Sequence, residues 1–287
     1  MSKVLITGGA GYIGAELTDH LLREGHEVTI IDNLMYDATS LLRYTINPNF
    51  TFIKGDVVNL EFLKKYMPEA DIIIPLAALV GFPLCDRDKR GAVEINHGAN
   101  AWIAKNKTPE QKVIYPCTNS GYGVSVDGSV CTEESPLNPV SLYGQTKVAA
   151  EQEYRNTDNC VTFRLATVFG PGSRMRTDLL VNNFVLKVCR AFMFVINNWE
   201  DCKNETYNVG NDSINMNKLQ LAQKIKDHMP LEIIKAEFTS DPDTRDYIVS
   251  SQKFYDKGFE CKYDLDDGIR QLVKAYSIIE SPWYANY

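Results

Sequence analysis

Three side chains in the middle of the chain have the types and spacing to oxidise an alcohol. Tyr143 and Lys147 stand four residues apart in a stretch that reads as a helix, so both lie on one helical face. A nearby ammonium favours the phenolate form of a tyrosine and lowers its pKa, so that it can take a proton from an alcohol. Thr118 follows a buried strand, and its hydroxyl can bond the same substrate oxygen. A Tyr/Lys pair alone is usually structural, and it becomes informative only together with the motifs below.

A glycine-rich turn near the N-terminus predicts a dinucleotide site. It joins an expected strand, Lys3–Thr7, to an expected helix, Ile13–Glu24, and reads Gly8-Gly9-Ala10-Gly11-Tyr12-Ile13-Gly14. Glycines let the backbone approach a pyrophosphate, which the N-terminus of the helix attracts. Asp32, eighteen residues after Gly14, ends the second expected strand. A carboxylate there can accept both ribose hydroxyls and would repel a 2′-phosphate, so we expect NAD rather than NADP; the alternative is glycines that serve packing alone.

Two further motifs follow the third and fourth expected strands, and each has a structural alternative. Asp56, in Gly55-Asp56-Val57, could bond the adenine amino group, although a simple turn explains this motif almost as well. The small residues of Leu76-Ala77-Ala78 would let a cofactor lie against the backbone, or they could serve packing at the edge of the sheet.

Short β-branched runs alternate with helical stretches over the first two thirds of the chain. The expected strands are Lys3–Thr7, Glu27–Ile31, Phe50–Ile53, Asp71–Ile74, Lys112–Tyr115 and Val161–Arg164, and the expected helices include Arg90–Lys105 and Leu142–Arg155. Nearly all-apolar strands in this alternation predict an α/β fold, a doubly wound Rossmann sheet covered on both faces. Beyond Phe169 the pattern is irregular, and we expect helices over Asp178–Phe194, from about Asn217 and over Leu265–Ser277, with a strand at Thr206–Val209.

Composition limits the partners and the location of the protein. The net charge of −7 argues against nucleic acid as the main partner. Seven scattered cysteines, odd in number and without a CxxC pair, suit a reducing compartment and argue against a metal site. No apolar run could span a bilayer, and the chain enters a strand at once without a signal-peptide pattern. We therefore expect a cytoplasmic protein with no membrane partner.

Taken together, the motifs resemble the extended short-chain dehydrogenase/reductases, in the group of nucleotide-sugar epimerases and dehydratases. The resemblance also involves Asn33, Asn96 and Arg164. It implies that Tyr143 is the base, Lys147 its partner and Thr118 the clamp on the substrate oxygen, with a nucleoside-diphosphate hexose or heptose oxidised at C4. It implies that NAD is held by Gly8, Gly11, Tyr12, Ile13, Gly14, Asp32, Asn33, Asp56, Val57, Leu76, Ala77, Ala78, Asn96, Tyr143 and Lys147.

Departures from the family pattern narrow the expected reaction. The family's 4,6-dehydratases carry Asp-Glu directly after the threonine, whereas Asn119 and Ser120 stand there in this chain. Neither side chain is an acid or base at neutral pH, which argues against dehydration. The 3,5-epimerases carry a cysteine two residues before the tyrosine that matches Tyr122, and here that residue is Ser120. What remains is 4-epimerisation, or net oxidation or reduction at C4.

Four segments also resemble a subgroup of the family whose members oxidise GDP-manno-heptose at C4 for bacterial capsule synthesis. They are Ile74–Gly81, Thr118–Gly123, Cys131–Pro136 and Arg174–Arg176. Pro75 in place of the usual histidine, and Thr167 in place of the usual asparagine, fit that subgroup. The resemblance implies NAD-dependent conversion of GDP-manno-heptose to its 4-keto sugar; the alternative is a nucleotide-sugar 4-epimerase with tightly bound NAD.

An acidic chain that binds a diphosphate needs local arginines. Arg245 matches the family's diphosphate arginine, and guanidinium forks suit paired phosphate oxygens. For Arg174 and Arg176, solvated surface arginines remain an equal alternative. The substrate residues implied by the resemblance are Val80, Asn119, Ser120, Thr167, Arg174, Arg176 and Arg245.

The resemblance also implies the domain organisation and the assembly. We expect an NAD-binding domain of residues 1–167 plus 191–216, and a smaller, discontinuous nucleotide-sugar domain of residues 168–190 plus 217–287. The helices Arg90–Lys105 and Leu142–Arg155 match those that form a four-helix dimer interface, so we expect a homodimer, with a tetramer left open.

Family members carry an extra strand and loop where Arg190 meets Ala191 in this chain. Either this protein lacks that piece or, as we favour, a loop is missing from the sequence.

Overall fold

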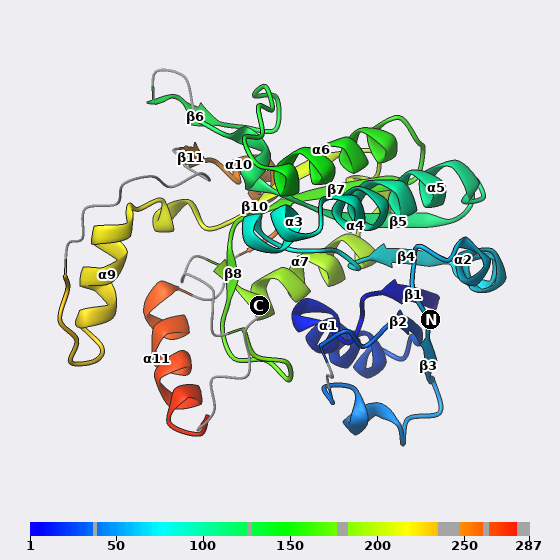
Figure 1. Cartoon of the computed structure of the whole chain (residues 1–287), viewed down its shortest axis with the longest axis horizontal. Helices are drawn as coiled ribbons and strands as arrows, with labels where there is room; N and C mark the ends of the chain where they lie inside the picture. The colour runs from blue at the N-terminus through cyan, green and yellow to red at the C-terminus, as the bar shows by residue number, and fades with distance from the viewer. Residues whose placement is uncertain (37–38, 125–127, 177–182, 235–246, 261–263, 280–287) are drawn as a thin grey trace.

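The computed structural model describes residues 1–36, 39–124, 128–176, 183–234, 247–260 and 264–279. At its centre is a parallel seven-stranded sheet with the spatial order β3-β2-β1-β4-β5-β7-β10 (Figure 1). Its strands are β1 (Lys3–Thr7), β2 (Glu27–Asp32), β3 (Phe50–Lys54), β4 (Ile72–Pro75), β5 (Lys112–Thr118), β7 (Cys160–Leu165) and β10 (Thr206–Val209). The order runs outward from β1 in both directions, as in a Rossmann sheet, so the predicted doubly wound α/β fold is confirmed.

Both faces of the sheet are apolar because helices cover both. Ile6 and Ile30 point to one face, and their neighbours Leu5 and Ile31 point to the other. Figure 1 shows α1 and α7 on the first side and α5 and α6 on the second. The covering helices are α1 (Tyr12–Arg23) and α7 (Val185–Asn197) on the first face, and α2 (Leu60–Tyr66), α5 (Ala99–Asn106) and α6 (Leu142–Arg155) on the second.

The helix expected at Arg90–Lys105 is interrupted by a π-helical turn. It consists of α4 (Lys89–Val93), the turn η3 (Glu94–Gly98) and then α5. Such turns often re-aim a side chain at a functional position. Here the turn buries Asn96, whose amide oxygen accepts from the Leu79 N–H at 2.8 Å and whose amide nitrogen donates to the Leu79 carbonyl at 3.0 Å. Asn96 therefore fixes the loop that follows β4.

Helix α7 runs without a break across the junction where a missing loop was predicted. Its fully buried residues Val185, Val188, Cys189, Phe192 and Val195 follow helical spacing and belong to the core cluster that also contains α1. The apolar stripe continues across the junction, and whether a loop is missing from the sequence there stays a prediction. Its described start lies seven residues after the predicted one, and residues 177–182 lie outside the described part of the chain.

A smaller apolar cluster forms beside the sheet from segments distant in sequence. It joins Phe169 and Met175 to Leu221, Leu265 and Ile269, as the predicted second domain requires. The exact domain division stays a prediction.

The other α-helices are α3 (Phe82–Arg87), α8 (Trp199–Cys202), α9 (Lys218–Lys226), α10 (Gln252–Asp256) and α11 (Leu265–Tyr276). Two short parallel strand pairs complete the fold: β6 (Val130–Cys131) pairs with β11 (Ile248–Val249), and β8 (Val168–Phe169) pairs with β9 (Asn183–Phe184).

One part of the range assigned to the smaller domain packs elsewhere. Phe254 of α10 and Phe259 belong to the main core, under the sheet.

Within the described ranges, no helix combines the length and the apolar character needed to cross a bilayer.

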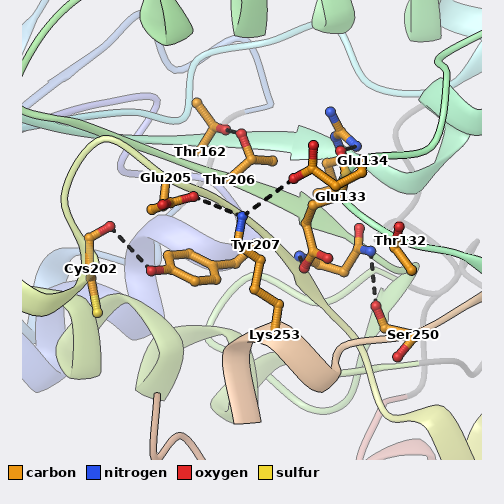
Figure 2. A network of polar contacts seen from close by, with 12 residues as sticks. Thr132, Glu133, Glu134, Thr162, Cys202, Glu205, Thr206, Tyr207, Ser250 and Lys253 are labelled. Atoms are coloured by element: carbon orange, nitrogen blue, oxygen red, sulfur yellow. Dashed lines mark hydrogen bonds and ion pairs between the residues drawn. The ribbon is translucent and has the colours of Figure 1, made fainter. Parts of the chain in front are cut away.

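Polar side chains close the open edge of the sheet at β10 (Figure 2). Glu133 Oε1 accepts from the backbone N–H of Asn208 at 2.6 Å, on a strand that lies at the end of the sheet. The hydroxyls of Thr162 and Thr206 lie 2.8 Å apart, and Lys253 donates to Glu205 at 2.8 Å. An edge N–H that no strand pairs is thereby satisfied.

A buried ion pair joins β7 to α6. Arg164 Nη2 and Glu151 Oε1 are 2.7 Å apart, and both side chains are only 1% exposed. Arg164 also donates to the Tyr122 hydroxyl and to the Glu133 carbonyl, each at 3.0 Å. The carboxylate beside it raises the pKa of the guanidinium against the opposing effect of burial. The pair fixes the sheet-facing side of the helix that carries Tyr143 and Lys147.

We predict that Arg164→Met lowers the free energy of unfolding by about 3–5 kcal/mol, because it leaves the Glu151 carboxylate buried and unpaired. The control is Arg90→Met, which breaks an equally short pair with Glu94 at 2.7 Å on the surface. Urea unfolding should show a large fall in midpoint for the first variant and little change for the second. Equal midpoints would contradict this account; the double variant Arg164→Met/Glu151→Leu should recover part of the loss.

Candidate active site

The principal cleft opens at the carboxyl ends of the parallel strands, where open α/β sheets bind their ligands. Its volume is about 430 Å³. Its walls come from the loops after β1, β3 and β4, the last residues of β2, β5 and β7, the segment after β7, and the helices α1, α3 and α6. Most of the predicted site residues line this one cleft. They are Gly8, Gly11, Tyr12, Ile13, Gly14, Asp32, Asn33, Asp56, Val57, Leu76, Ala77, Ala78, Val80, Thr118, Ser120, Tyr143, Lys147, Thr167, Arg174 and Arg176.

Two predicted site residues are not on its walls, and a third cannot be placed because it lies outside the described residues. Asn96 lies behind the cleft and holds the Leu79 backbone instead of meeting a ligand directly. Asn119 is buried, 3% exposed, and its side-chain oxygen has no hydrogen-bond partner among the described residues. The turn η4 (Asn119–Tyr122) directs this side chain into the protein. Arg245 lies outside the described residues.

The glycine turn brings two backbone segments into close contact. Gly8 has a φ of +71°, and a Cβ added there would lie 2.5 Å from the backbone nitrogen of Ala77. A Cβ on Gly14 would lie 2.6 Å from Cα of Gly9, whereas one on Gly11 would meet a single atom, the Gly8 carbonyl, at 3.1 Å. Gly11 is also the N-cap of α1 and offers no side chain to the helix's first N–H groups. These groups can bind a pyrophosphate, so the turn fits a dinucleotide.

Asp32 stands at the adenosine end of this cradle. Its two carboxylate oxygens accept from the backbone N–H groups of Ala10 at 3.0 Å and Leu34 at 2.8 Å. Each oxygen keeps a lone pair that can accept a hydrogen bond from a ribose hydroxyl. Burial raises the pKa of Asp32, while both backbone donors and the Arg174 guanidinium oppose that rise. The fixed carboxylate fits NAD, as the sequence predicted.

The catalytic candidates meet at the end of β5 and the start of α6. Thr118, the last residue of β5, donates to Ser120 Oγ at 3.1 Å and accepts from the Ser120 N–H at 3.1 Å. Tyr143 is the second residue of α6, whose cap, Ser141, accepts from the Gly144 N–H at 3.3 Å. The positive end of the helix dipole therefore favours a phenolate at Tyr143.

Lys147 lies one turn further along α6 and is almost fully buried. Its ammonium is 4.2 Å from the centre of the Tyr115 ring, and the residue is 4% exposed. Burial lowers its pKa to about 8, although Glu151 on the next turn acts in the opposite direction. A cation buried in the wall of the cleft can stabilise a nearby phenolate strongly, because little water screens the interaction between the two charges.

Several residues of the cleft were not predicted from sequence. Tyr36, Phe82 and Tyr247 come from loops or a helix start, where no repeating pattern marks them. Cys117 also lines the cleft, directly before Thr118 at the end of β5. It could have been found, because residues at the carboxyl end of a central strand face the ligand crevice. Burial raises the pKa of its thiol well above the usual range, so Cys117 is neutral.

A Rossmann sheet with a dinucleotide cradle and a tyrosine–lysine pair in one cleft defines a nucleotide-dependent enzyme of the short-chain dehydrogenase/reductase type. The chain belongs to the NAD dependent epimerase/dehydratase family, whose model matches residues 4–193. Its cofactor is NAD.

Known relatives in this family include both epimerases and dehydratases. Low-salt glycan biosynthesis protein Agl12 of Haloferax volcanii is 27% identical over 95% of this chain and 98% of its own. The structure of dTDP-glucose 4,6-dehydratase from Bacillus anthracis with NAD has a TM-score of 0.82 at 22% identity, covering 99% of each chain. UDP-glucuronic acid 4-epimerase from Bacillus cereus, with UDP-glucuronic acid and NAD, has a TM-score of 0.83 at 20% identity, covering 96% of this chain and 100% of that one. The shared fold thus accommodates both reactions.

We predict that Gly8→Ala lowers the free energy of unfolding by more than about 2 kcal/mol and abolishes NAD binding, since the new Cβ meets backbone in a left-handed conformation. Gly25→Ala is the matched control, with a φ of +80° and nothing within 4 Å of the added Cβ. It should cost about 1 kcal/mol and leave NAD affinity intact. Urea unfolding and calorimetry measure both; equal effects of the two variants would disprove the role given to Gly8.

We also predict that Lys147→Met stabilises the folded protein at pH 7 while removing its activity. The pKa of Lys147 falls from 10.5 to about 8 on folding, so the burial penalty is full below pH 8 and fades as pH rises towards 10.5. At pH 7 the gain should be about 3 kcal/mol, and it should shrink above pH 8. Unfolding measured across pH tests this, with Lys64→Met on the surface as the control. A gain that does not depend on pH would refute the assignment.

Proposed function

We propose that the protein oxidises a nucleoside-diphosphate sugar at C4 to the 4-keto sugar. The observation that carries this proposal is that Thr118, Tyr143 and Lys147 line the same cleft as the glycine turn and Asp32. An alcohol bound at the end of β5 would therefore meet a proton acceptor and a dinucleotide together. NAD, when bound, supplies the hydride acceptor for this reaction.

The protein's own groups handle the proton of the C4 hydroxyl. Tyr143, as phenolate, accepts that proton and becomes a neutral phenol. The Lys147 ammonium holds the phenolate form available beforehand, with help from the dipole of α6. As the substrate oxygen loses its proton, the Thr118 hydroxyl turns from Ser120 and donates to it, so the oxygen keeps a hydrogen bond throughout.

Dehydration fits the cleft less well. Asp32 and Asp56 are the carboxylates among its described lining residues. Asp32 ends β2 and Asp56 follows β3, and both strands lie on the adenosine side. Ser120 stands beside Thr118, and Asn119 is turned away from the cleft. Loss of water from C5 and C6 needs an acid and a base near the sugar, so this supports chemistry confined to C4.

A 4-epimerase with retained NAD is the second candidate, because the same residues would serve it. The two reactions differ after the oxidation: a dehydrogenase releases the keto sugar, whereas an epimerase lets the keto sugar rotate in the site and then returns the hydride to C4. GDP-manno-heptose is our proposed substrate, supported by the resemblance of segments that include Val80 and Ser120 and by Thr167 in place of the usual asparagine. All three residues line the cleft.

We also infer a homodimer through α4, α5 and α6. These helices lie together on one face of the sheet in Figure 1, and Val93 of α4 is 45% exposed there. An apolar side chain on the outer face of the helix layer is consistent with a helical interface.

Incubation with NAD and GDP-manno-heptose tests the proposed reaction. We expect NADH and a 4-keto sugar; a C4 epimer without net NADH would instead support the second candidate. Tyr143→Phe should lower kcat by about 10²–10⁴-fold with little change in NAD affinity, because it removes only the proton acceptor. Tyr66→Phe, the same substitution in α2 and outside the cleft, serves as the control and should retain turnover. Unchanged kcat in Tyr143→Phe would rule out this tyrosine as the base.

A further inference from the structure

The loop after β8 is fastened to the first helix of the dinucleotide cradle. The Tyr12 hydroxyl of α1 donates to the Gly170 carbonyl at 2.5 Å. One turn further along α1, Glu16 Oε1 accepts from both the backbone N–H and the hydroxyl of Ser173, each at 2.7 Å. Gly172 lies against the Tyr12 ring, since a Cβ added there would be 3.0 Å from it. These contacts hold the segment 170–173 over the N-terminal turns of α1.

This anchorage places Arg174 against the loop that follows β2. Its guanidinium carbon lies 4.1 Å from the centre of the Tyr36 ring, a cation–π contact. Tyr36 stands four residues after Asp32, and all three residues line the cleft. The positive charge of Arg174 also opposes the rise in the pKa of Asp32 that burial causes. Arg174 therefore belongs to the adenosine side of the cleft.

The catalytic side is distant from this position. Thr118 ends β5, and Asp32 ends β2, with β4 and β1 between those strands. Three inter-strand steps of about 4.8 Å separate the two ends by roughly 14 Å. A sugar held at Thr118 and Tyr143 is therefore far from the Asp32 end, whereas a dinucleotide spans the distance between them.

We propose that Arg174, backed by the Tyr36 ring, is a cofactor-binding residue that bonds the adenosine half of NAD at the Asp32 end of the cleft, and not a substrate residue. Its planar fork suits the oxygens of a ribose or pyrophosphate. Stacking on Tyr36 orients the guanidinium before the cofactor arrives, which lowers the entropy cost of binding. The inference rests on the NAD cofactor alone and is independent of the proposed oxidation at C4.

Calorimetric titration with NAD, without any sugar, tests the proposal. Arg174→Ala should weaken NAD binding by at least about tenfold, the loss expected for a hydrogen bond from a charged group. Tyr36→Leu should weaken it by less, since the guanidinium remains. Arg23→Ala removes the same charge at the far end of α1, where its side chain is 77% exposed, and should leave affinity unchanged. Unchanged NAD affinity in Arg174→Ala, with weakened binding of GDP, would overturn the proposal in favour of a substrate role.

A second titration uses NADP and a double variant. Asp32→Asn removes the charge that repels a 2′-phosphate, and Arg174 would then be able to pair with that phosphate. NADP affinity should rise by at least about tenfold in Asp32→Asn, and this gain should disappear in Asp32→Asn/Arg174→Ala. An equal gain in both backgrounds would place Arg174 away from the adenosine ribose and contradict the inference. Thermal unfolding of each cofactor-free variant controls for loss of fold.

Discussion

Parallel pairing of the seven strands is the constraint from which the site follows. Every strand of the sheet ends at the same edge, so Gly8, Asp32, Ala77 and Thr118 meet in one cleft although they are far apart in sequence. The meeting is tight where the order of strands reverses, because the turn after β1 approaches the backbone after β4 with no room for a Cβ at Gly8. One topology thus brings the dinucleotide cradle and the proposed catalytic pair, Tyr143 and Lys147, into the same cleft.

Helix α6 carries Tyr143 and Lys147, and its packing on the sheet sets where these two side chains lie. Its inner side is fixed to β7 by the buried pair of Arg164 and Glu151, and the same side carries Lys147 into the cleft wall. Burying an ammonium is unfavourable, as the lowered pKa of Lys147 records. In the proposed mechanism this cost has a function, because a poorly hydrated cation near Tyr143 would stabilise a phenolate far better than a solvated one.

The sheet, and the meeting of Thr118, Tyr143 and Lys147 in one cleft, were predictable because both follow from short-range sequence patterns. Apolar runs mark β1 and β10 to the residue, and the spacing of Tyr143 and Lys147 marks one face of a helix. Local sequence patterns do not predict features that depend on tertiary contacts. The π turn at Asn96 exists because its amide bonds the Leu79 backbone, and a helical pattern does not reveal that bond. The inward turn of Asn119 likewise depends on packing around η4.

Arg174 illustrates the same limit at the site itself. Its residue type predicts a phosphate contact, but which ligand it faces depends on the docking of its loop onto α1 through Glu16 and Tyr12. No periodic signal encodes that docking. Conversely, Val80 and Thr167, which we expect to contact the sugar, are uncharged residues of the cleft wall, so their residue types do not reveal which sugar binds.

Isotope transfer tests the central claim, that Tyr143 and the dinucleotide act on the same C4 hydroxyl, most directly. A nucleoside-diphosphate sugar deuterated at C4 would be turned over with NAD, and the reduced cofactor analysed by mass spectrometry. The account predicts that the deuterium appears in NADH, and that Tyr143→Phe suppresses this transfer while NAD still binds. Bound sugar and NAD with no deuterium reaching the cofactor, or transfer undiminished in Tyr143→Phe, would contradict it.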